Sequence, residues 1–201
     1  MILTGDGLPQ RDSEITRVGN QQAKGLIGVT NSFAYKSFGL SFLVDARIGG
    51  EIFSASNVGL QRFGVADVTA PGGQRPDMVL DGVIVSGPSY AENTASITQQ
   101  QYWNSVGTLG NLGIGEANIY DATNVRLRNI SLSYSLPKGL LGDTFQSAKA
   151  SLTCNNVWMI KSNLNGIDPE SVFATGTNAV GVESGAFPTM RSFLFSLSLG
   201  F

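Results

Sequence analysis

The sequence predicts an all-β protein whose strands form an antiparallel segment of a transmembrane β-barrel. Three observations indicate this fold class. Apolar and polar residues alternate over long segments, the connections between these segments are either very short or very long, and charged residues make up only 14% of the chain. An average soluble domain has roughly 25% charged residues, whereas barrel strands alternate lipid-facing apolar residues with polar residues on the inside.

Composition also excludes most catalytic chemistry. The 201 residues include no histidine and one cysteine, Cys154. This excludes His-based acid–base catalysis, His-ligated metals and an internal disulfide, and Cys154 is interpreted as a small hydrophobic residue. The net charge of −2 offers no basic surface for nucleic acid. We therefore expect no enzyme activity, no cofactor, no metal and no nucleic-acid partner.

The first two strands are predicted at residues 26–36 and 38–50, and Lys36-Ser37 joins them in a tight hairpin turn. Every second residue of the second strand is apolar, and the opposite face is mainly polar. The apolar set is Phe38, Leu40, Phe42, Val44, Ala46 and Ile48, and the opposite set includes Ser41, Asp45 and Arg47.

Three further strands are predicted at residues 124–136, 149–159 and 191–201, where apolar residues alternate mainly with serine, threonine or asparagine. The last strand is the clearest. Its apolar positions are Phe193, Phe195, Leu197, Leu199 and Phe201. A tilted strand needs about 9–11 residues to cross a bilayer, so the predicted strands are long enough to span one.

A soluble β-sandwich is the structural alternative, since its strands also alternate. Ordinary strands have about five or six residues, so the strand lengths favour the barrel. Aromatic residues near the strand ends also fit the girdles of a membrane barrel; they are Phe33, Tyr35, Phe38, Tyr134 and Trp158. No apolar run is long enough for a transmembrane helix, and the first residues lack the pattern of a signal peptide.

Long loops are predicted at residues 51–123 and 161–189, and residues 1–24 are expected to end a further loop. The turns at Lys36-Ser37 and at residues 137–147 are short. This asymmetry is typical of outer-membrane barrels, whose extracellular loops are long and whose periplasmic turns are short. Five strands leave two open edges, so we expect the chain to be a piece of something larger.

Seven stretches of the chain, in their order and spacing, resemble the C-terminal part of the SusC/RagA-type TonB-linked outer-membrane transporters. They are Arg17-Val-Gly-Asn20, Asn31-Ser-Phe-Ala-Tyr-Lys36, Leu40 to Gly50, Tyr120-Asp121, Val125 to Pro137, Gly166-Ile-Asp-Pro-Glu170 and Pro188 to Phe201. The stretches extend over nearly the whole chain, and the long central loop is its least matched part.

The resemblance implies that residues 1–201 form the C-terminal portion of a plugged barrel, consistent with the roughly 22 strands of outer-membrane transporters. The plug, the TonB box and the earlier strands are expected to lie outside this chain. The implied function is Bacteroidetes-type uptake of oligosaccharides or peptides across the outer membrane. The implied partners are a SusD-like surface lipoprotein, the TonB complex and outer-membrane lipid.

Aromatic residues in the loops are candidates for contact with substrate or with the lipoprotein, because aromatic residues are enriched at interface cores. They are Phe63, Tyr90, Tyr102, Trp103 and Phe173. Packing of the loops on themselves explains these residues equally well. Phe201 ends the last strand, and the resemblance implies that it belongs to the signal read by the barrel-assembly machinery. A phenylalanine there also simply faces lipid, and both interpretations can hold.

Charged residues are the remaining candidates for contact with a substrate or with a metal ion. Asp45 with Arg47, and Arg126 with Arg128, are expected either to line the lumen and meet a polar substrate or, as the sequence favours, to form a solvated network on the barrel wall. A second set carries oxygen ligands suited to Ca²⁺, but without the spacing of a calcium loop, so turn chemistry is expected instead. This set is Asp168, Glu170, Asp6, Asp12 and Glu14.

Three functions compete at this point. The first is the wall and loops of a TonB-dependent importer. The second is a soluble β-rich carbohydrate-binding or adhesion module, which would fold without detergent and bury the face of residues 193–201 against a second sheet. A hydrolase comes last, since it needs two converging carboxylates and nothing in the sequence selects such a pair.

Overall fold

The computed structural model describes residues 1–107, 113–142, 144–164, 166–173 and 175–201. The chain divides into two compact units, which are described separately. The first unit contains Met1–Asn20, Ile52–Tyr120 and Val172–Ala186, and the second contains Gln21–Glu51, Asp121–Ser171 and Phe187–Phe201. Among the described residues, no helix is both long enough and apolar enough to cross a membrane.

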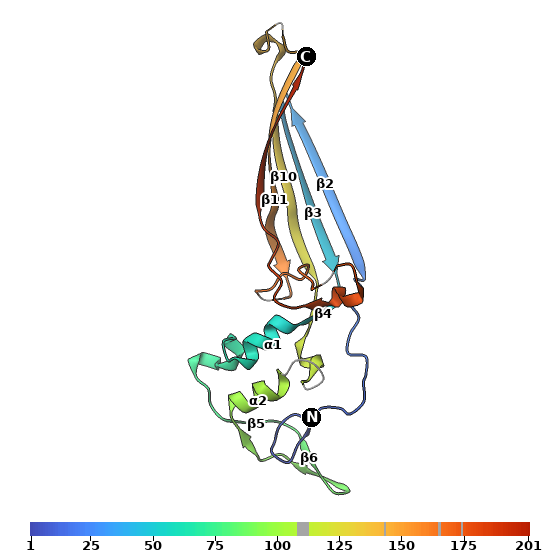
Figure 1. Ribbon diagram of the computed structural model, residues 1–201, viewed down its shortest axis with the longest axis vertical. Helices are drawn as coiled ribbons and strands as arrows, with labels where there is room; N and C mark the ends of the chain where they lie inside the picture. Colours follow the sequence, from blue (N-terminus) through green and yellow to red (C-terminus); the bar gives the residue numbers. More distant parts are fainter. Residues whose placement is uncertain (108–112, 143, 165, 174) are drawn as a thin grey trace. The chain divides into compact units, whose positions relative to one another are not determined.

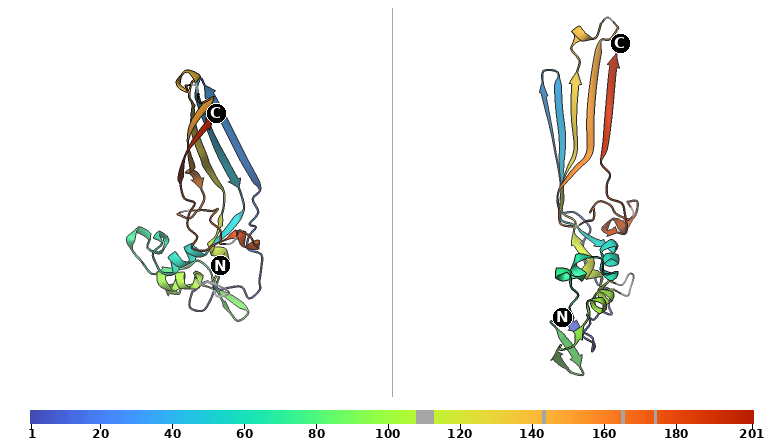
Figure 2. Two further views of the ribbon diagram at one scale, coloured as in Figure 1. Left: turned by 45° about the horizontal axis from the view of Figure 1, so that its top comes forward. Right: turned by 90° about the vertical axis from the view of Figure 1, so that its left-hand side faces the viewer.

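The second unit is built on one antiparallel sheet of five strands, in the order β13-β11-β10-β3-β2 (Figure 1). The strands are β2 (Gly25–Tyr35), β3 (Phe38–Ile48), β10 (Asn124–Ser135), β11 (Ser147–Ser162) and β13 (Ser192–Gly200). The two further views in Figure 2 show these strands running side by side as long ribbons. Within the described part of the chain, β2 and β13 each have a strand partner on one edge only, so the sheet is not closed.

The turn between β2 and β3 is the two-residue hairpin expected from the sequence. Tyr35 pairs with Phe38, and Lys36 adopts a left-handed backbone with φ of 53°. Its ammonium group lies 5.4 Å from the centre of the Tyr35 ring. The register of β2 on β3 places Phe33 opposite Leu40 and Val29 opposite Val44, so apolar residues share one face of the hairpin.

This apolar face continues across all five strands and is exposed. On β13, Phe193 is 72% exposed and Phe195 is 67% exposed. The opposite face carries mainly serine, threonine and charged residues, because side chains alternate along each strand. The exposed apolar set is Ile27, Val29, Phe33, Tyr35, Phe38, Leu40, Ile48, Leu132, Leu152, Trp158, Phe193, Phe195, Leu197 and Leu199.

A β-bulge changes the alternation in the middle of β10. The pairing of β10 with β3 shifts by one residue between Leu127 and Asn129. Beyond the bulge, Ile130 pairs with Phe42, and before it Leu127 pairs with Val44. Strict alternation would place Arg126 and Arg128 on the face of Ile130, because all three numbers are even. The bulge instead leaves Arg126 opposite Asp45, on the polar face.

The first unit contains two helices and several short strands. The helices are α1 (Ala55–Arg62) and α2 (Gln99–Val106). The short strands form the sheets β12-β4-β9, β1-β6-β7 and β5-β8. Their bounds are β1 Ile2–Leu3, β4 Glu51–Ser54, β5 Met78–Val79, β6 Val83–Ser86, β7 Ser89–Glu92, β8 Ser96–Ile97, β9 Ile119–Asp121 and β12 Val182–Glu183. Short 3₁₀ turns in the described part of this unit lie at Asp67–Thr69, Pro71–Gly73, Gly115–Asn118 and Asn178–Gly181, and a further one in the second unit lies at Lys138–Leu140.

The loop predicted over residues 51–123 is therefore largely folded, apart from residues 108–112, which lie outside the described part. Both helices begin at a capping residue. Ser54 Oγ accepts a hydrogen bond from the Asn57 amide at 3.1 Å, and Thr98 forms a capping box with Gln101. Each helix has only eight residues. Such short helices leave little periodic signal in a sequence, which explains why periodicity alone missed them.

The first unit has a small core of mixed character. Leu3, Ile52, Val58 and Ile97 are buried in it. Glu183 is also buried, and its carboxylate accepts hydrogen bonds from the hydroxyls of Ser54 at 2.7 Å and Ser56 at 2.5 Å. Because Glu183 lies on β12 and both serines lie at the start of α1, this contact ties residues far apart in the sequence into one fold.

Candidate functional site

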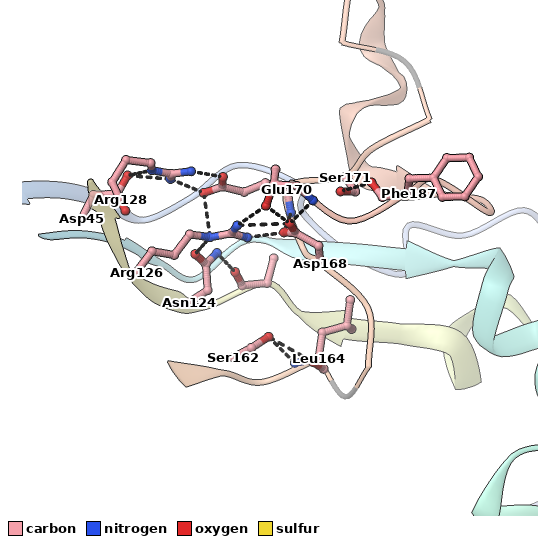
Figure 3. A network of polar contacts seen from close by, with 12 residues as sticks. Asp45, Asn124, Arg126, Arg128, Ser162, Leu164, Asp168, Glu170, Ser171 and Phe187 are labelled. Atoms are coloured by element: carbon pink, nitrogen blue, oxygen red, sulfur yellow. Dashed lines mark hydrogen bonds and ion pairs between the residues drawn. The ribbon is translucent and has the colours of Figure 1, made fainter. Parts of the chain in front are cut away.

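A network of charged side chains lies on the polar face of the five-stranded sheet (Figure 3). Arg126 and Arg128 come from β10 and Asp45 comes from β3. Asp168 and Glu170 come from the segment that follows β11. Two arginines thus face three carboxylates, and the pairs join the sheet to a segment about forty residues further along the chain.

Arg126 and Asp168 form the buried centre of this network. Each side chain is only 5% exposed. Arg126 Nη1 donates to Asp168 Oδ2 at 3.1 Å, and Nη2 contacts Asp168 Oδ1. Arg126 also donates from Nε to Asn124 Oδ1 at 3.0 Å and from Nη1 to Thr189 Oγ1 at 3.2 Å. The planar guanidinium therefore binds the carboxylate in a bidentate manner, which is the strong arrangement for such a pair.

Arg128 bridges the two other carboxylates. Its Nη1 and Nη2 atoms donate to the two oxygens of Glu170 at 2.8 and 2.9 Å. Its Nε and Nη2 atoms donate to Asp45 Oδ2 at 2.8 and 2.6 Å. The side chains of Arg128, Asp45 and Glu170 are about one quarter to one third exposed. This half of the network is therefore partly solvated, as the sequence analysis favoured, whereas the Arg126 half is buried.

The Asp168-Pro169-Glu170 turn is organised around the Asp168 carboxylate. Asp168 Oδ1 accepts from the Glu170 amide at 2.9 Å. Oδ2 accepts from the Thr189 amide at 3.1 Å and from its hydroxyl at 2.7 Å. Burial by itself would raise the pKa of Asp168, but the hydrogen bonds from Arg126, the Glu170 amide and Thr189 outweigh it and hold that pKa well below its ordinary value.

These contacts leave the Asp168 and Glu170 carboxylates occupied by protein donors. In the described part of the chain, no group of three or more acidic or cysteine side chains is arranged to hold a metal ion. Asp6, Asp12 and Glu14 belong to the first unit, where Asp12 Oδ1 accepts from the Glu14 amide at 2.9 Å. The geometry therefore favours carboxylates that stabilise turns by accepting backbone hydrogen bonds, rather than calcium ligands, at both segments.

The lowered pKa of Asp168 sets an expected pH dependence. The carboxyl of an unfolded Asp titrates at about 3.9, above its value in the folded protein. Its contribution to stability should therefore be complete above about pH 5 and disappear as the pH falls below about 4. The unfolding free energies of the wild type and Asp168→Asn, measured from pH 8 to pH 2.5, should differ by a constant amount at high pH and converge in acid. A difference that already shrinks at pH 6 would contradict this assignment.

The five loop aromatics proposed from the sequence all belong to the first unit. Phe63, Tyr90 and Phe173 are exposed. Tyr102 and Trp103 are half-buried on α2, with their rings edge to face at 4.9 Å. Phe63 and Trp103 line a common cleft in the described part of this unit. The structure thus brings two of the five together and leaves Tyr90, on β7, and Phe173 apart from that cleft.

The cleft shared by Phe63 and Trp103 has a volume of about 170 Å³. It also contains Arg62 and Arg75, which the sequence analysis did not select, and the amide side chains of Gln61, Gln99 and Gln100. The two arginines lie 13 positions apart and carry no shared motif. The capping residue Thr98 was the available signal that a helix begins next to Gln99.

Phe201 lies at the end of the sheet where the short turns are. Its ring centre is 5.8 Å from that of Phe145, and the neighbouring Gly200 carbonyl accepts from the Gln146 amide at 2.8 Å. The Phe201 side chain is exposed.

No protein-family model matches the chain. A curated relative, TonB-dependent receptor P3 of Formosa agariphila, is 27% identical over 206 residues, which cover 99% of this chain and 18% of the relative. Two solved structures of the RagAB peptide importer share the fold at 14% sequence identity. The "open-open" state gives a TM-score of 0.53 and the "closed-closed" state one of 0.55, each over 88% of this chain and 17% of that one.

The structural matches and the sequence match point to the same class of protein, the TonB-dependent transporters. The chain matches part of the RagAB peptide importer in structure, so the predicted fold class is confirmed. The resemblance to SusC/RagA-type TonB-dependent transporters is likewise confirmed, by the relative named as a TonB-dependent receptor and by the RagAB neighbours. The chain spans less than a fifth of the length of these proteins.

Proposed function

We propose that this chain forms part of the barrel wall and the extracellular loops of a TonB-dependent importer in the outer membrane. One observation carries the proposal. The five-stranded sheet has a continuous apolar face that nothing in the described chain covers, and its opposite face is polar. Contiguous apolar surface of this kind is rare on soluble monomers, whereas it is the outer surface of a membrane barrel.

Aromatic side chains at the ends of the strands support a lipid-facing role for the apolar face. Tyr35, Phe38 and Tyr134 occupy paired positions across three strands at the hairpin end, and the rings of Phe38 and Tyr134 are 4.7 Å apart. Trp158 lies near the opposite end of β11 and is exposed. A row of aromatic residues at one end of the sheet and a tryptophan near the other fit the girdles expected at the two interfaces of a membrane.

The opposite face is suited to water. Ser131 and Thr153 form a hydroxyl–hydroxyl hydrogen bond at 2.8 Å across neighbouring strands. A shallow hollow on this face is lined by five serines together with Lys149, Phe33, Leu40 and Gly39. Hydroxyl groups that bind water and one another, with the ammonium group of Lys149 among them, form a wet wall past which a polar substrate can move.

The competing functions are less well supported. The soluble module requires the face of residues 193–201 to pack against a second sheet, yet Phe193, Phe195 and Leu197 are all exposed. A hydrolase requires carboxylates free to act as acid and base. The three carboxylates that converge, those of Asp45, Asp168 and Glu170, are each paired with an arginine.

The finer parts of the proposal come from the relatives. The receptor named for TonB supports energy coupling through TonB by a part of the protein outside this chain. The RagAB structures, which their titles describe as a peptide importer, support peptides as cargo and a SusD-like lipoprotein as the partner of the loops. Oligosaccharides are the alternative cargo that the sequence resemblance implies. We place residues 1–201 at the C-terminal end of the barrel and assign the protein no catalytic role.

The detergent dependence of folding tests the barrel proposal. The isolated chain should show no cooperative thermal transition by far-UV circular dichroism in plain buffer, because its apolar face has no cover there. In detergent micelles, or with the upstream part of the barrel supplied, it should gain β-structure and melt cooperatively. A sharp melt in plain buffer would overturn the barrel proposal and favour the soluble module.

Phe201 is proposed as part of the assembly signal. Its exposed ring at the turn end of the sheet is accessible to a receptor. Phe201→Ala should lower the amount of protein recovered in the outer-membrane fraction several-fold, while Phe173→Ala, an exposed aromatic of the first unit, should leave it unchanged. Equal recovery of both variants would assign Phe201 to lipid contact alone.

A further inference from the structure

The cleft between the end of α1 and the start of α2 carries positive charge that the described protein does not neutralise. Arg62 lies in the last turn of α1. Arg75 is fixed beside it, since its Nη2 donates to the Gly64 carbonyl at 2.7 Å. Among the described residues, no carboxylate forms an ion pair with either arginine, and no acidic side chain lines the cleft.

Uncharged amide side chains line the cleft beside the two arginines. Gln61 is buried, and its Oε1 has no hydrogen-bond donor in the described structure. That oxygen has almost no solvent-accessible surface, and the Gln61 amide nitrogen donates to the Tyr120 hydroxyl at 3.3 Å, so Gln61 lines the cleft without offering this oxygen to a ligand. On α2, Trp103 Nε1 donates to Gln99 Oε1 at 3.1 Å, which fixes the indole at the wall of the cleft.

The lining offers aromatic surface but no aliphatic hydrophobic side chain. It includes two aromatic residues, Phe63 and Trp103, but no leucine, isoleucine, valine or methionine. Phe63 is 78% exposed. Flat aromatic groups next to planar guanidinium and amide groups fit a ring that carries hydroxyls. Guanidinium groups also bind a carboxylate with geometric specificity.

We propose that this cleft is a subsite for an acidic sugar, with the carboxylate held by Arg62 and Arg75 and the sugar ring lying against Phe63 and Trp103. The inference rests on the proposed function, because it names the class of cargo that the loops of the importer meet. The volume of about 170 Å³ suits one sugar unit of a longer chain. An acidic peptide is the competing ligand, but it supplies the carboxylate without the ring of hydroxyls.

Binding of three matched probes tests the subsite. The probes are tri-galacturonate, a neutral trisaccharide and tri-glutamate, titrated calorimetrically into the folded 201-residue chain. The solvent is plain buffer or detergent, whichever gives the folded state. Tri-galacturonate should bind at least tenfold more tightly than the other two, and its affinity should fall with added salt.

Variants assign that binding to the cleft. Arg62→Gln should weaken tri-galacturonate binding about tenfold or more, and Arg62→Gln with Arg75→Gln should abolish it. Arg11→Gln, an exposed arginine of the first unit outside the cleft, should leave it unchanged. Arg62 is the sharper test, since Arg75 also holds the Gly64 carbonyl, and circular dichroism confirms that each variant is folded.

The possible outcomes separate the two proposals. Equal affinity for tri-glutamate would replace the sugar with an acidic peptide, and binding unaffected by the arginine variants, or no binding by the folded chain, would overturn the subsite. Binding that depends on the arginines but occurs in plain buffer, with a cooperative melt there, would support the subsite and overturn the barrel.

Discussion

Leu152→Arg is expected to prevent assembly of the chain into the outer membrane. Leu152 lies in the middle of β11 on the exposed apolar face, opposite Leu132 on β10 and Phe195 on β13. Arginine on the lipid-facing side of a barrel strand costs about 2–4 kcal/mol near the middle of the bilayer. We expect at least a tenfold loss of folded protein from the outer-membrane fraction, measured by its resistance to unfolding in cold sodium dodecyl sulfate.

The neighbouring residue provides a matched control. Ser151 points to the opposite face and pairs with Ser133 and Ser196. Ser151→Arg introduces the same side chain one position away, where the proposed lumen is wet, and should leave assembly close to that of the wild type. If both variants assemble equally well, the apolar face does not contact lipid. If Ser151→Arg alone fails, the two faces of the sheet have been assigned the wrong way round.

Arg126→Ala is expected to destabilise the second unit by about 3–5 kcal/mol, the usual cost of breaking a buried ion pair by removing one partner. The reason is that Asp168 would stay buried without its guanidinium. Arg126→Lys should recover only part of the loss, because an ammonium group cannot grip the carboxylate at two points. Equilibrium unfolding of the protein in detergent measures these changes.

A second measurement separates local from global effects. The amides of Glu170 and Thr189 both donate to Asp168, so their hydrogen exchange should speed up more in Arg126→Ala than exchange in β2 does. Arg191→Ala removes an exposed arginine whose Nη2 bonds the Val157 carbonyl, and should change stability by less than about 0.5 kcal/mol. An Arg126→Ala variant as stable as Arg191→Ala would show that the network contributes nothing to stability.

The long strands were predictable because their signal is local. Residues such as Phe193, Phe195 and Leu197 alternate with small polar residues, and this pattern depends only on nearest neighbours in the sequence. The short helices were not predictable by the same means. The first has a serine cap and eight residues, and burial within the first unit, rather than periodicity, determines its place in the fold.

The site was predictable in part. Arg126 and Arg128 were identified as neighbours on one face, but their partners were not, since Asp168 and Glu170 lie 42 residues away and Asp45 lies 83 residues away from Arg128. Pairing at that range depends on strand order and on the bulge, neither of which a single sequence displays. In the same way, Phe63 and Trp103 were selected separately, and only the fold of the first unit brings them to one cleft.

The bulge between Leu127 and Asn129 makes the number of residues in β10 as important as their identity. Deleting Arg128, the extra residue, would restore strict alternation and leave Arg126 opposite Asp45 on the polar face, three positions from Ile130. Elsewhere in a strand, a one-residue deletion turns apolar positions inward; here it would leave both halves of β10 on the faces that they already occupy. A one-residue deletion in this strand should therefore be tolerated at the bulge, or at the turn end beyond Tyr134, and elsewhere only deletions of two residues should be tolerated.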